Sequence, residues 1–296
     1  MNVIITGCSG FLGQHLITTI NQSKKKWKLF GIDKVEVTNQ LDNFYLLDFI
    51  DEVDWKSILT EIKPDIIFHL AGVYHNASID SMIKINTLQT LSLLDTIQKN
   101  NLNPIVVLIG SASQYGYINP KDNPIDETHS QNPILYHGYS KKWQEEIGLM
   151  FVKKHSLNVI CTRPTNFIGK GIAPTLLPGY LTHLFQSEET EEVIIDISSK
   201  TARRDYVDVR DAAQALIKLC ETTSCIGEVF NISSSKSISN EKIIELYGKI
   251  SKRKFKIQES SKKDDLDISL SNEKIKRYTD WKIKHTIEES ITWSLS

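Results

Sequence analysis

Short apolar runs alternate along the first half of the chain with longer stretches in which apolar residues recur every three or four positions. Continuous runs such as Ile105–Ile109 suit strands that are covered on both faces, and their alternation with helices indicates parallel strands. The pattern therefore predicts the α/β class, with a Rossmann-type doubly wound parallel sheet. The expected strands are 2–5, 28–32, 65–70, 105–109 and 159–162, and the expected helices are 11–21, 55–62, 83–99 and 140–155.

The rhythm changes after Pro164. Loops bearing glycine and proline are expected from Gly169 to Gly179, followed by a polar helix. Further strands are expected at 192–197 and 228–232, further helices at 209–221 and 239–250, and a loop at 259–267. This part does not read as an independent fold. We expect residues 1–164 to form the first domain and residues 165–296 mainly a smaller α/β cap, with some segments returning to the first domain.

Charge and composition narrow the class of protein. The 296 residues include 35 Lys and Arg against 36 Asp and Glu, so the basic excess of a nucleic-acid binder is missing. No apolar run reaches the ~18 residues of a membrane span, and the first strand leaves no room for a signal peptide. We therefore expect a cytoplasmic protein with no nucleic-acid or membrane partner. Residues 236–285 hold 14 basic and 8 acidic residues, either as a solvated surface or as an attraction for an anionic substrate.

Cysteine usage gives no sign of a metal or of disulfide bonds. The four cysteines are scattered, and no Cys-x-x-Cys pair occurs among them. We therefore expect free thiols in a reducing compartment and no bound metal. They are Cys8, Cys161, Cys220 and Cys225.

A glycine-rich turn lies between the first expected strand and the first expected helix. Its residues are Gly7, Cys8, Ser9, Gly10, Phe11, Leu12 and Gly13. Glycines at such a turn let the backbone approach a pyrophosphate, which the helix N-terminus then attracts. Asp33 follows Gly13 by 20 residues, where an acid accepts the ribose hydroxyls of NAD and repels a 2′-phosphate. We expect NAD(H) to be preferred; the neighbouring Lys34 would soften the exclusion of NADP(H).

The spacing Gly-x-x-Gly-x-x-Gly resembles the short-chain dehydrogenase/reductase superfamily. Further motifs resemble its extended branch, the NAD-dependent epimerase/dehydratase type, which acts on nucleotide sugars. The resemblance implies that the residues of these motifs line the cofactor or the substrate. The cofactor motifs are Asp48 with Phe49, the run Leu70, Ala71 and Gly72, then Asn86, and Pro164 with Asn166.

Two segments bring the resemblance closer to GDP-4-keto-6-deoxy-D-mannose reductases. They are residues 110–133 and 204–211. The resemblance implies that Ser113, Asn166 and Arg204 contact a nucleotide diphosphate sugar, Arg204 through its phosphates. A loop cap at Asn166 and a surface ion pair of Arg204 with Asp205 or Asp208 are the alternatives. Helices 83–99 and 140–155 carry apolar residues on more than one face. The resemblance implies that they form the interface of a homodimer, and core packing alone is the alternative.

The catalytic segment departs from the family pattern. The resemblance assigns Ser111 as the catalytic serine and Lys141 as the lysine that lowers the pKa of a tyrosine four residues before it. That position holds His137. An imidazole titrates near neutral pH and would itself serve as proton donor, although it is shorter than a phenol. Alternatively, Tyr136 or Tyr139 swings in, or the site is weakened and substrate or water delivers the proton.

The same segment argues against one reaction of the branch. Dehydratases carry an Asp-Glu pair after the serine, and here Ala112 and Ser113 occupy those positions. We expect a reductase acting at C4 of a 4-keto-6-deoxy sugar. A 4-epimerase with tightly bound NAD is the alternative enzyme, and a catalytically weak dinucleotide sensor or partner subunit is the alternative without turnover.

Overall fold

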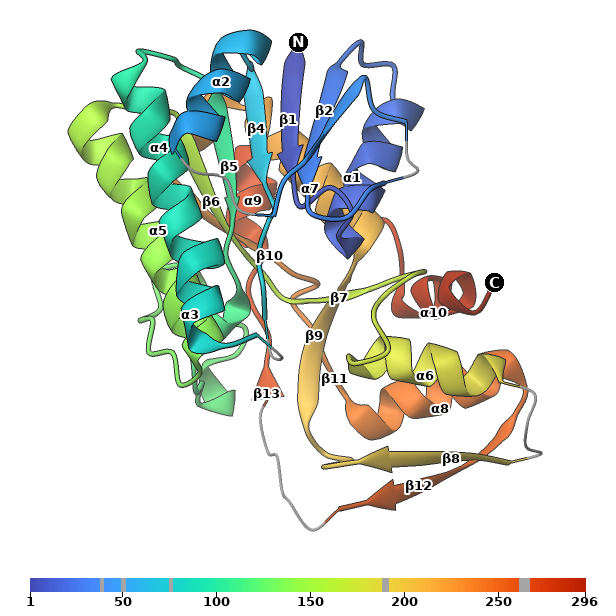
Figure 1. Cartoon of the computed structure of the whole chain (residues 1–296). Helices are drawn as coiled ribbons and strands as arrows, with labels where there is room; N and C mark the ends of the chain where they lie inside the picture. Colours follow the sequence, from blue (N-terminus) through green and yellow to red (C-terminus); the bar gives the residue numbers. More distant parts are fainter. Residues whose placement is uncertain (38–39, 49–51, 75–76, 188–191, 261–266) are drawn as a thin grey trace.

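The structure is a computed structural model that describes residues 1–37, 40–48, 52–74, 77–187, 192–260 and 267–296. Its upper half in Figure 1 is a seven-stranded sheet in the order β10-β6-β5-β4-β1-β2-β3, and every pairing is parallel. The predicted doubly wound sheet is therefore confirmed. The strands are β1 (Asn2–Thr6), β2 (Lys28–Asp33), β3 (Asn43–Leu46), β4 (Ile66–His69), β5 (Ile105–Ile109), β6 (Val159–Pro164) and β10 (Val229–Ile232).

Helices cover both faces of this sheet (Figure 1). The inner strands bury nearly all their side chains, as expected for strands with helices on both sides. On one face, α1 (Phe11–Gln22), α7 (Val209–Cys220) and α9 (Glu273–Tyr278) build a core with the strands. On the other face the core contains α2 (Glu52–Ile62), α4 (Gln89–Lys99) and α5 (Tyr136–His155). A short α3 (Ile79–Met82) and a π-helical turn, η1 (Ile83–Leu88), lead into α4.

The second part of the molecule occupies the lower half of Figure 1. Strands β7 (Asn166–Ile168), β9 (Arg203–Asp208), β11 (Ser237–Ser239) and β13 (Asp267–Ile268) form one sheet, and β8 (Glu192–Ile197) pairs with β12 (Lys254–Glu259) in another. Helices α6 (Leu177–Gln186), α8 (Asn240–Ser251) and α10 (Ile287–Leu295) pack around a separate core with these strands. Short 3₁₀ turns occur at η2 (Ala112–Gln114), η3 (Pro120–Asp122) and η4 (Thr223–Cys225).

Several elements differ from the sequence expectation. Helix α6 begins at Leu177, inside the stretch expected to be a loop, and it is not polar, because it buries Leu181 and Phe185 in the second core. Helix α5 begins at Tyr136, four residues earlier than expected. Helix α2 also begins earlier, at Glu52. Of the expected loop 259–267, residues 261–266 lie outside the described part.

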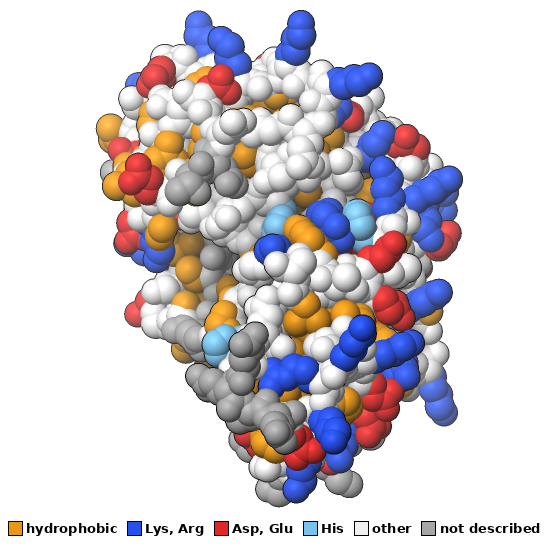
Figure 2. Space-filling model, turned by 90° about the vertical axis from the view of Figure 1, so that its right-hand side faces the viewer, with side chains coloured by type: hydrophobic (Ala, Val, Ile, Leu, Met, Phe, Trp, Pro, Cys, Tyr) orange, Lys and Arg blue, Asp and Glu red, His pale blue; other side chains and the backbone are white. Residues whose placement is uncertain are grey.

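The distribution of charged side chains on the surface agrees with the nearly balanced composition. Figure 2 shows basic and acidic side chains intermingled on one face of the molecule, in keeping with the formal net charge of −1. All four cysteines are buried free thiols. Within the described ranges no helix is both long enough and apolar enough to cross a membrane.

Candidate active site

The glycine-rich turn lies at the carboxyl edge of the parallel sheet, between β1 and α1. Gly7 has a positive φ of 67°, and a Cβ there would lie 2.7 Å from the Ala71 backbone nitrogen. A Cβ at Gly13 would lie 2.4 Å from the Gly7 carbonyl oxygen. Gly10 caps α1 without a side chain, so the first-turn amides of this 12-residue helix are left to an outside acceptor. The cradle therefore fits a diphosphate held by backbone amides.

Asp33 is fixed beside this turn at the end of β2. Its carboxylate accepts a hydrogen bond from the Ser9 amide at 2.9 Å and another from the Lys34 amide at 2.7 Å. The Lys34 ammonium lies 3.8 Å from the Asp48 carboxylate, and both side chains are exposed. The acid is thus placed where an adenosine ribose would lie if a diphosphate occupied the turn. Phe49, also expected at the cofactor, lies outside the described residues.

The segment after β4 brings the motifs expected at the cofactor next to Lys141. Leu70 and Ala71 donate their amides to Thr6 of β1, at 3.2 and 3.1 Å. A Cβ at Gly72 would lie 3.1 Å from the Lys141 ammonium and 3.2 Å from the Asn86 amide oxygen. Asn86 is fully buried, and its amide donates to the Val73 carbonyl and the Ser140 hydroxyl. Residues distant in the sequence therefore converge where β4 and α5 meet.

Lys141 is buried one turn into α5. Its ammonium donates to the Ile109 carbonyl at 2.7 Å and to the Gln144 amide oxygen at 2.9 Å. Burial lowers the pKa of Lys141 to about 7. Burial and the nearby Lys141 charge lower the pKa of His69 to about 3, so that imidazole stays neutral. Lys141 thus changes charge near neutral pH.

A chain of hydrogen bonds joins the three side chains expected at the catalytic centre and the substrate. The Ser113 hydroxyl lies 3.1 Å from His137 Nδ1 and donates to the Ser111 hydroxyl at 2.8 Å. The early start of α5 places His137 in its first turn, facing the 3₁₀ turn η2. Tyr136 and Tyr139 are 63% and 42% exposed, and the Tyr139 ring packs against Trp143 on α5. The structure brings His137, and neither tyrosine, to the serines.

A buried polar network contacts this turn, and no motif in the sequence pointed to it. The Gln114 side chain accepts a hydrogen bond from the Ser111 amide at 2.7 Å and donates to Glu145 at 3.0 Å. Glu145 also receives a bidentate pair of hydrogen bonds from Arg163, at 2.8 and 2.7 Å. Both charged side chains are at least 96% buried. The sequence offered one signal for Glu145: it is an acid one turn after Lys141, on the same helix face.

Of the three residues expected at the substrate, Asn166 and Arg204 lie on the second part of the molecule, whereas Ser113 lies on η2. Asn166 is exposed on β7 and donates to the Asp205 carbonyl at 3.2 Å. Arg204 is half-buried on β9. The two acids named as its alternative partners bind other groups: Asp205 accepts from the Ser234 hydroxyl, and Asp208 accepts two hydrogen bonds from the Arg210 guanidinium. Pro164, at the end of β6, is buried.

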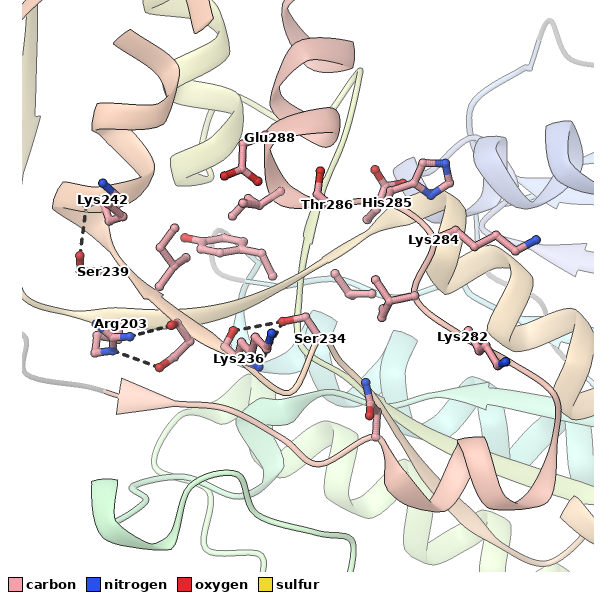
Figure 3. Close-up of a pocket in the computed structure, with 18 of the residues that line it drawn as sticks. Arg203, Ser234, Lys236, Ser239, Lys242, Lys282, Lys284, His285, Thr286 and Glu288 are labelled. Carbon is pink, nitrogen blue, oxygen red and sulfur yellow. Dashed lines mark hydrogen bonds between the residues drawn. The ribbon is translucent and has the colours of Figure 1, made fainter. Parts of the chain in front are cut away.

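A cavity of about 870 Å³ lies away from this constellation. It is lined by β9, β11, the start of α8 and the segment before α10, and by no residue of the glycine turn or of residues 111–141. Figure 3 shows its cations spread apart, with Arg203 and Lys242 at one end and Lys282 and Lys284 at the other. This cavity is therefore not the candidate active site, and its lysines do not converge on one point.

Comparisons with known proteins agree with this geometry. The model of the NAD dependent epimerase/dehydratase family matches residues 3–233. A GDP-6-deoxy-D-mannose reductase from Pseudomonas aeruginosa is 25% identical over 99% of this chain and 96% of the relative. A GDP-6-deoxy-D-talose 4-dehydrogenase from Aggregatibacter actinomycetemcomitans is 26% identical over 88% of this chain and 83% of the relative.

Solved structures show the same fold. RMD from Pseudomonas aeruginosa, complexed with NADPH, superposes with a TM-score of 0.84 at 23% identity, covering 99% of this chain and 96% of that one. A UDP-glucose 4-epimerase from Thermus thermophilus, complexed with NAD, gives 0.85 at 19% identity, covering 100% and 98%.

The fold and the glycine turn define an extended short-chain dehydrogenase/reductase. The chain belongs to the NAD dependent epimerase/dehydratase family, which confirms the resemblance seen in its motifs. The relatives that it matches are reductases, dehydratases and epimerases of nucleotide sugars. The chain is therefore placed among enzymes of this class.

Proposed function

We propose that this protein is an NAD(P)-dependent reductase of a nucleotide diphosphate sugar, acting on a 4-keto-6-deoxy sugar at C4. The observation that carries the proposal is the hydrogen-bonded set of Ser111, Ser113 and His137 beside the buried Lys141. The similarity to a GDP-6-deoxy-D-mannose reductase and a GDP-6-deoxy-D-talose 4-dehydrogenase supports a reaction at C4.

The dinucleotide would be held by the glycine turn and by Asp33, with NAD(H) preferred over NADP(H). When bound, it supplies the hydride that reduces the sugar carbonyl. Ser111 donates a hydrogen bond to that carbonyl oxygen, and His137 provides the proton that the oxygen takes up. Lys141 orients the nicotinamide ribose, and Arg204 binds the substrate diphosphate. The remaining cofactor contacts are Ser9, Phe11, Leu12, Lys34, Asp48, Leu70, Ala71, Gly72, Asn86, Pro164 and Asn166.

The two parts of the molecule then have separate tasks. Residues 1–164, joined by β10 and α7, form the NAD(P)-binding domain, and most of residues 165–296 form the substrate-binding cap. We place the protein in the cytoplasm, where nucleotide sugars and a reduced cofactor pool meet.

A direct assay distinguishes this function from its alternatives. Purified protein is incubated with NADH or NADPH and a panel of keto-sugar nucleotides, and cofactor oxidation and sugar products are measured. Cofactor consumed in equal amount with product supports the reductase. Retained NAD with interconversion of 4-epimers indicates the epimerase, and binding without turnover indicates the sensor.

Replacing Asp33 by Ala should weaken NADH binding and relax the rejection of NADPH. The carboxylate would otherwise accept ribose hydroxyls and repel a 2′-phosphate, and losing such a charge-assisted contact costs about 1.5–3 kcal/mol. Dissociation constants for both cofactors test this, with the exposed Glu36→Ala as a charge-matched control. Equal affinity of the wild type for NADH and NADPH would contradict it and implicate Lys34.

Replacing Arg204 by Ala should raise KM for the nucleotide sugar while KM for the dinucleotide stays unchanged. A lost phosphate contact of about 1.5–3 kcal/mol corresponds to a rise of roughly 10- to 100-fold. Arg203→Ala is the matched control. Arg203 directly precedes Arg204 in β9, and its guanidinium contacts Ser237 and Asp267. An unchanged KM in the Arg204 variant would restrict this arginine to a structural role.

We also propose that the protein is a homodimer through one apolar helix face. Large hydrophobic side chains that are 38–46% exposed gather on α3, η1, α4 and α5: Ile79, Leu88, Leu91, Tyr139, Trp143 and Met150. Exposed apolar surface of this kind marks an interface. Light scattering should give twice the chain mass for the wild type and the single mass for Leu91→Lys. A monomeric wild type at micromolar concentration would refute the dimer.

A further inference from the structure

The hydrogen bonds around Ser111 have a fixed direction. The Ser111 hydroxyl oxygen accepts from the Ser113 amide at 3.1 Å and from the Ser113 hydroxyl at 2.8 Å. A hydroxyl has two acceptor lone pairs and one proton. With both lone pairs engaged, Ser111 interacts with a substrate oxygen as a donor.

The same reasoning fixes the tautomer of His137. Ser113 uses its only hydroxyl proton on Ser111, so it accepts from His137 Nδ1 at 3.1 Å. A proton therefore sits on Nδ1. The chain runs from His137 Nδ1–H through Ser113 O–H to Ser111 O–H, with each group donating to the next.

We infer that Ser113 is a proton-relay residue that carries the proton from His137 Nδ1 to the sugar oxygen. This deepens the proposed reductase function and rests on it. As hydride reaches C4, the O4 oxygen takes the Ser111 proton, Ser111 takes the Ser113 proton, and Ser113 takes the Nδ1 proton of the imidazolium. One O–H bond forms at the sugar, both serines end as hydroxyls, and His137 ends neutral.

This relay accounts for an imidazole at the position where the family has a phenol. A histidine side chain is shorter than a tyrosine side chain, and two hydroxyls extend its reach. The direction of the chain also suits a carbonyl oxygen, which only accepts hydrogen bonds. The inferred substrate is thus a keto sugar, whereas oxidation of a sugar hydroxyl would first require the whole chain to reverse.

The experiment compares Ser113→Ala, Ser113→Thr and His137→Phe, alone and combined, using the purified full chain with NADH and the keto-sugar nucleotide that the assay above identifies. Ser113→Ala should lower kcat by about a hundredfold or more with KM and NADH affinity unchanged, and Ser113→Thr should restore most of it. In the His137→Phe background, Ser113→Ala should have no further effect, because both residues serve one path. Ser130→Ala is the matched control, because Ser130 is an exposed serine in the same connection whose hydroxyl accepts a hydrogen bond from Asn132.

A second readout does not depend on turnover. ¹⁵N NMR of the imidazole should show Nδ1 protonated in neutral His137, and Ser113→Ala should shift the tautomer population toward Nε2. Full activity of Ser113→Ala, or additive losses in the double variant, would overturn the relay. A wild type without turnover on any sugar nucleotide would refute the proposed function; the NMR result then still decides whether the hydrogen-bonded chain exists as inferred.

Discussion

Replacing His137 by Phe should lower turnover by about 10²–10⁴-fold, the usual cost of removing a general acid. The affinity for the dinucleotide should hardly change, because in the proposed function the glycine turn and Lys141 hold the cofactor independently of the imidazole. Phe keeps a planar ring in the first turn of α5 and removes both ring nitrogens, including the Nδ1 that faces Ser113. Single-turnover rates and cofactor titrations of the variant separate the two effects.

His137→Tyr restores the residue that the family uses and gives the sharper comparison. A higher rate would mean that the native site is a weakened version of the usual one. A lower rate would mean that the Ser113 and Ser111 hydroxyls are arranged for an imidazole. If the Phe, Tyr and His proteins all turn over equally fast, the proton comes from Tyr136, Tyr139 or solvent, and the assignment of His137 is wrong.

The pH profile adds a test with a definite sign. A proton donor must be protonated, so kcat for reduction should fall as pH rises through its pKa, near 6.5 for an ordinary imidazole. Lys141 titrates in the same region, because burial lowers its pKa to about 7. In His137→Tyr the imidazole limb should move to higher pH while any limb from Lys141 stays. If no limb of the pH profile moves in His137→Tyr, the whole pH dependence belongs to Lys141.

The sheet was predictable because its strands carry the signal in their own residues. The apolar runs of β4, β5 and β6 are buried on both faces, and their alternation with helices predicted that the strands run parallel. Strand β12 was missed because Lys254–Glu259 is largely exposed and pairs only with β8. The start of helix α6 was placed too late because Pro178 and Gly179 read as loop residues, although proline is favoured in the first turn of a helix.

The candidate active site was only partly predictable, for a related reason. Motif spacing pointed to Ser111, His137 and Lys141 as one group of residues. The contact between Ser113 and His137 spans 24 residues and depends on where α5 begins, which Gly138 obscured in the sequence. The ion pair of Glu145 and Arg163 joins a helix to a strand, and each residue alone resembles an ordinary surface charge.

The buried ion pair of Glu145 and Arg163 should contribute strongly to the free energy of unfolding of the region around the candidate active site. Glu145 accepts hydrogen bonds from Arg163, Gln114 and Gln131, and it and Arg163 are nearly inaccessible to solvent. Glu145→Gln keeps the shape but leaves the Arg163 guanidinium without a counter-charge. Breaking a buried pair from one side costs about 3–5 kcal/mol, so denaturant unfolding should show a loss of that size.

The neighbouring residue provides the control for this measurement. Glu146 is on the same helix and lies 3.9 Å from Lys142 in an exposed ion pair, so Glu146→Gln should cost less than about 1 kcal/mol. Because Gln114 links Glu145 to the Ser111 amide, Glu145→Gln should also lower kcat when assayed well below its unfolding midpoint. Equal stability losses in the two variants would contradict the special role of the buried pair. Unchanged kcat in a destabilised Glu145 variant would show that the Ser111 turn keeps its geometry without this support.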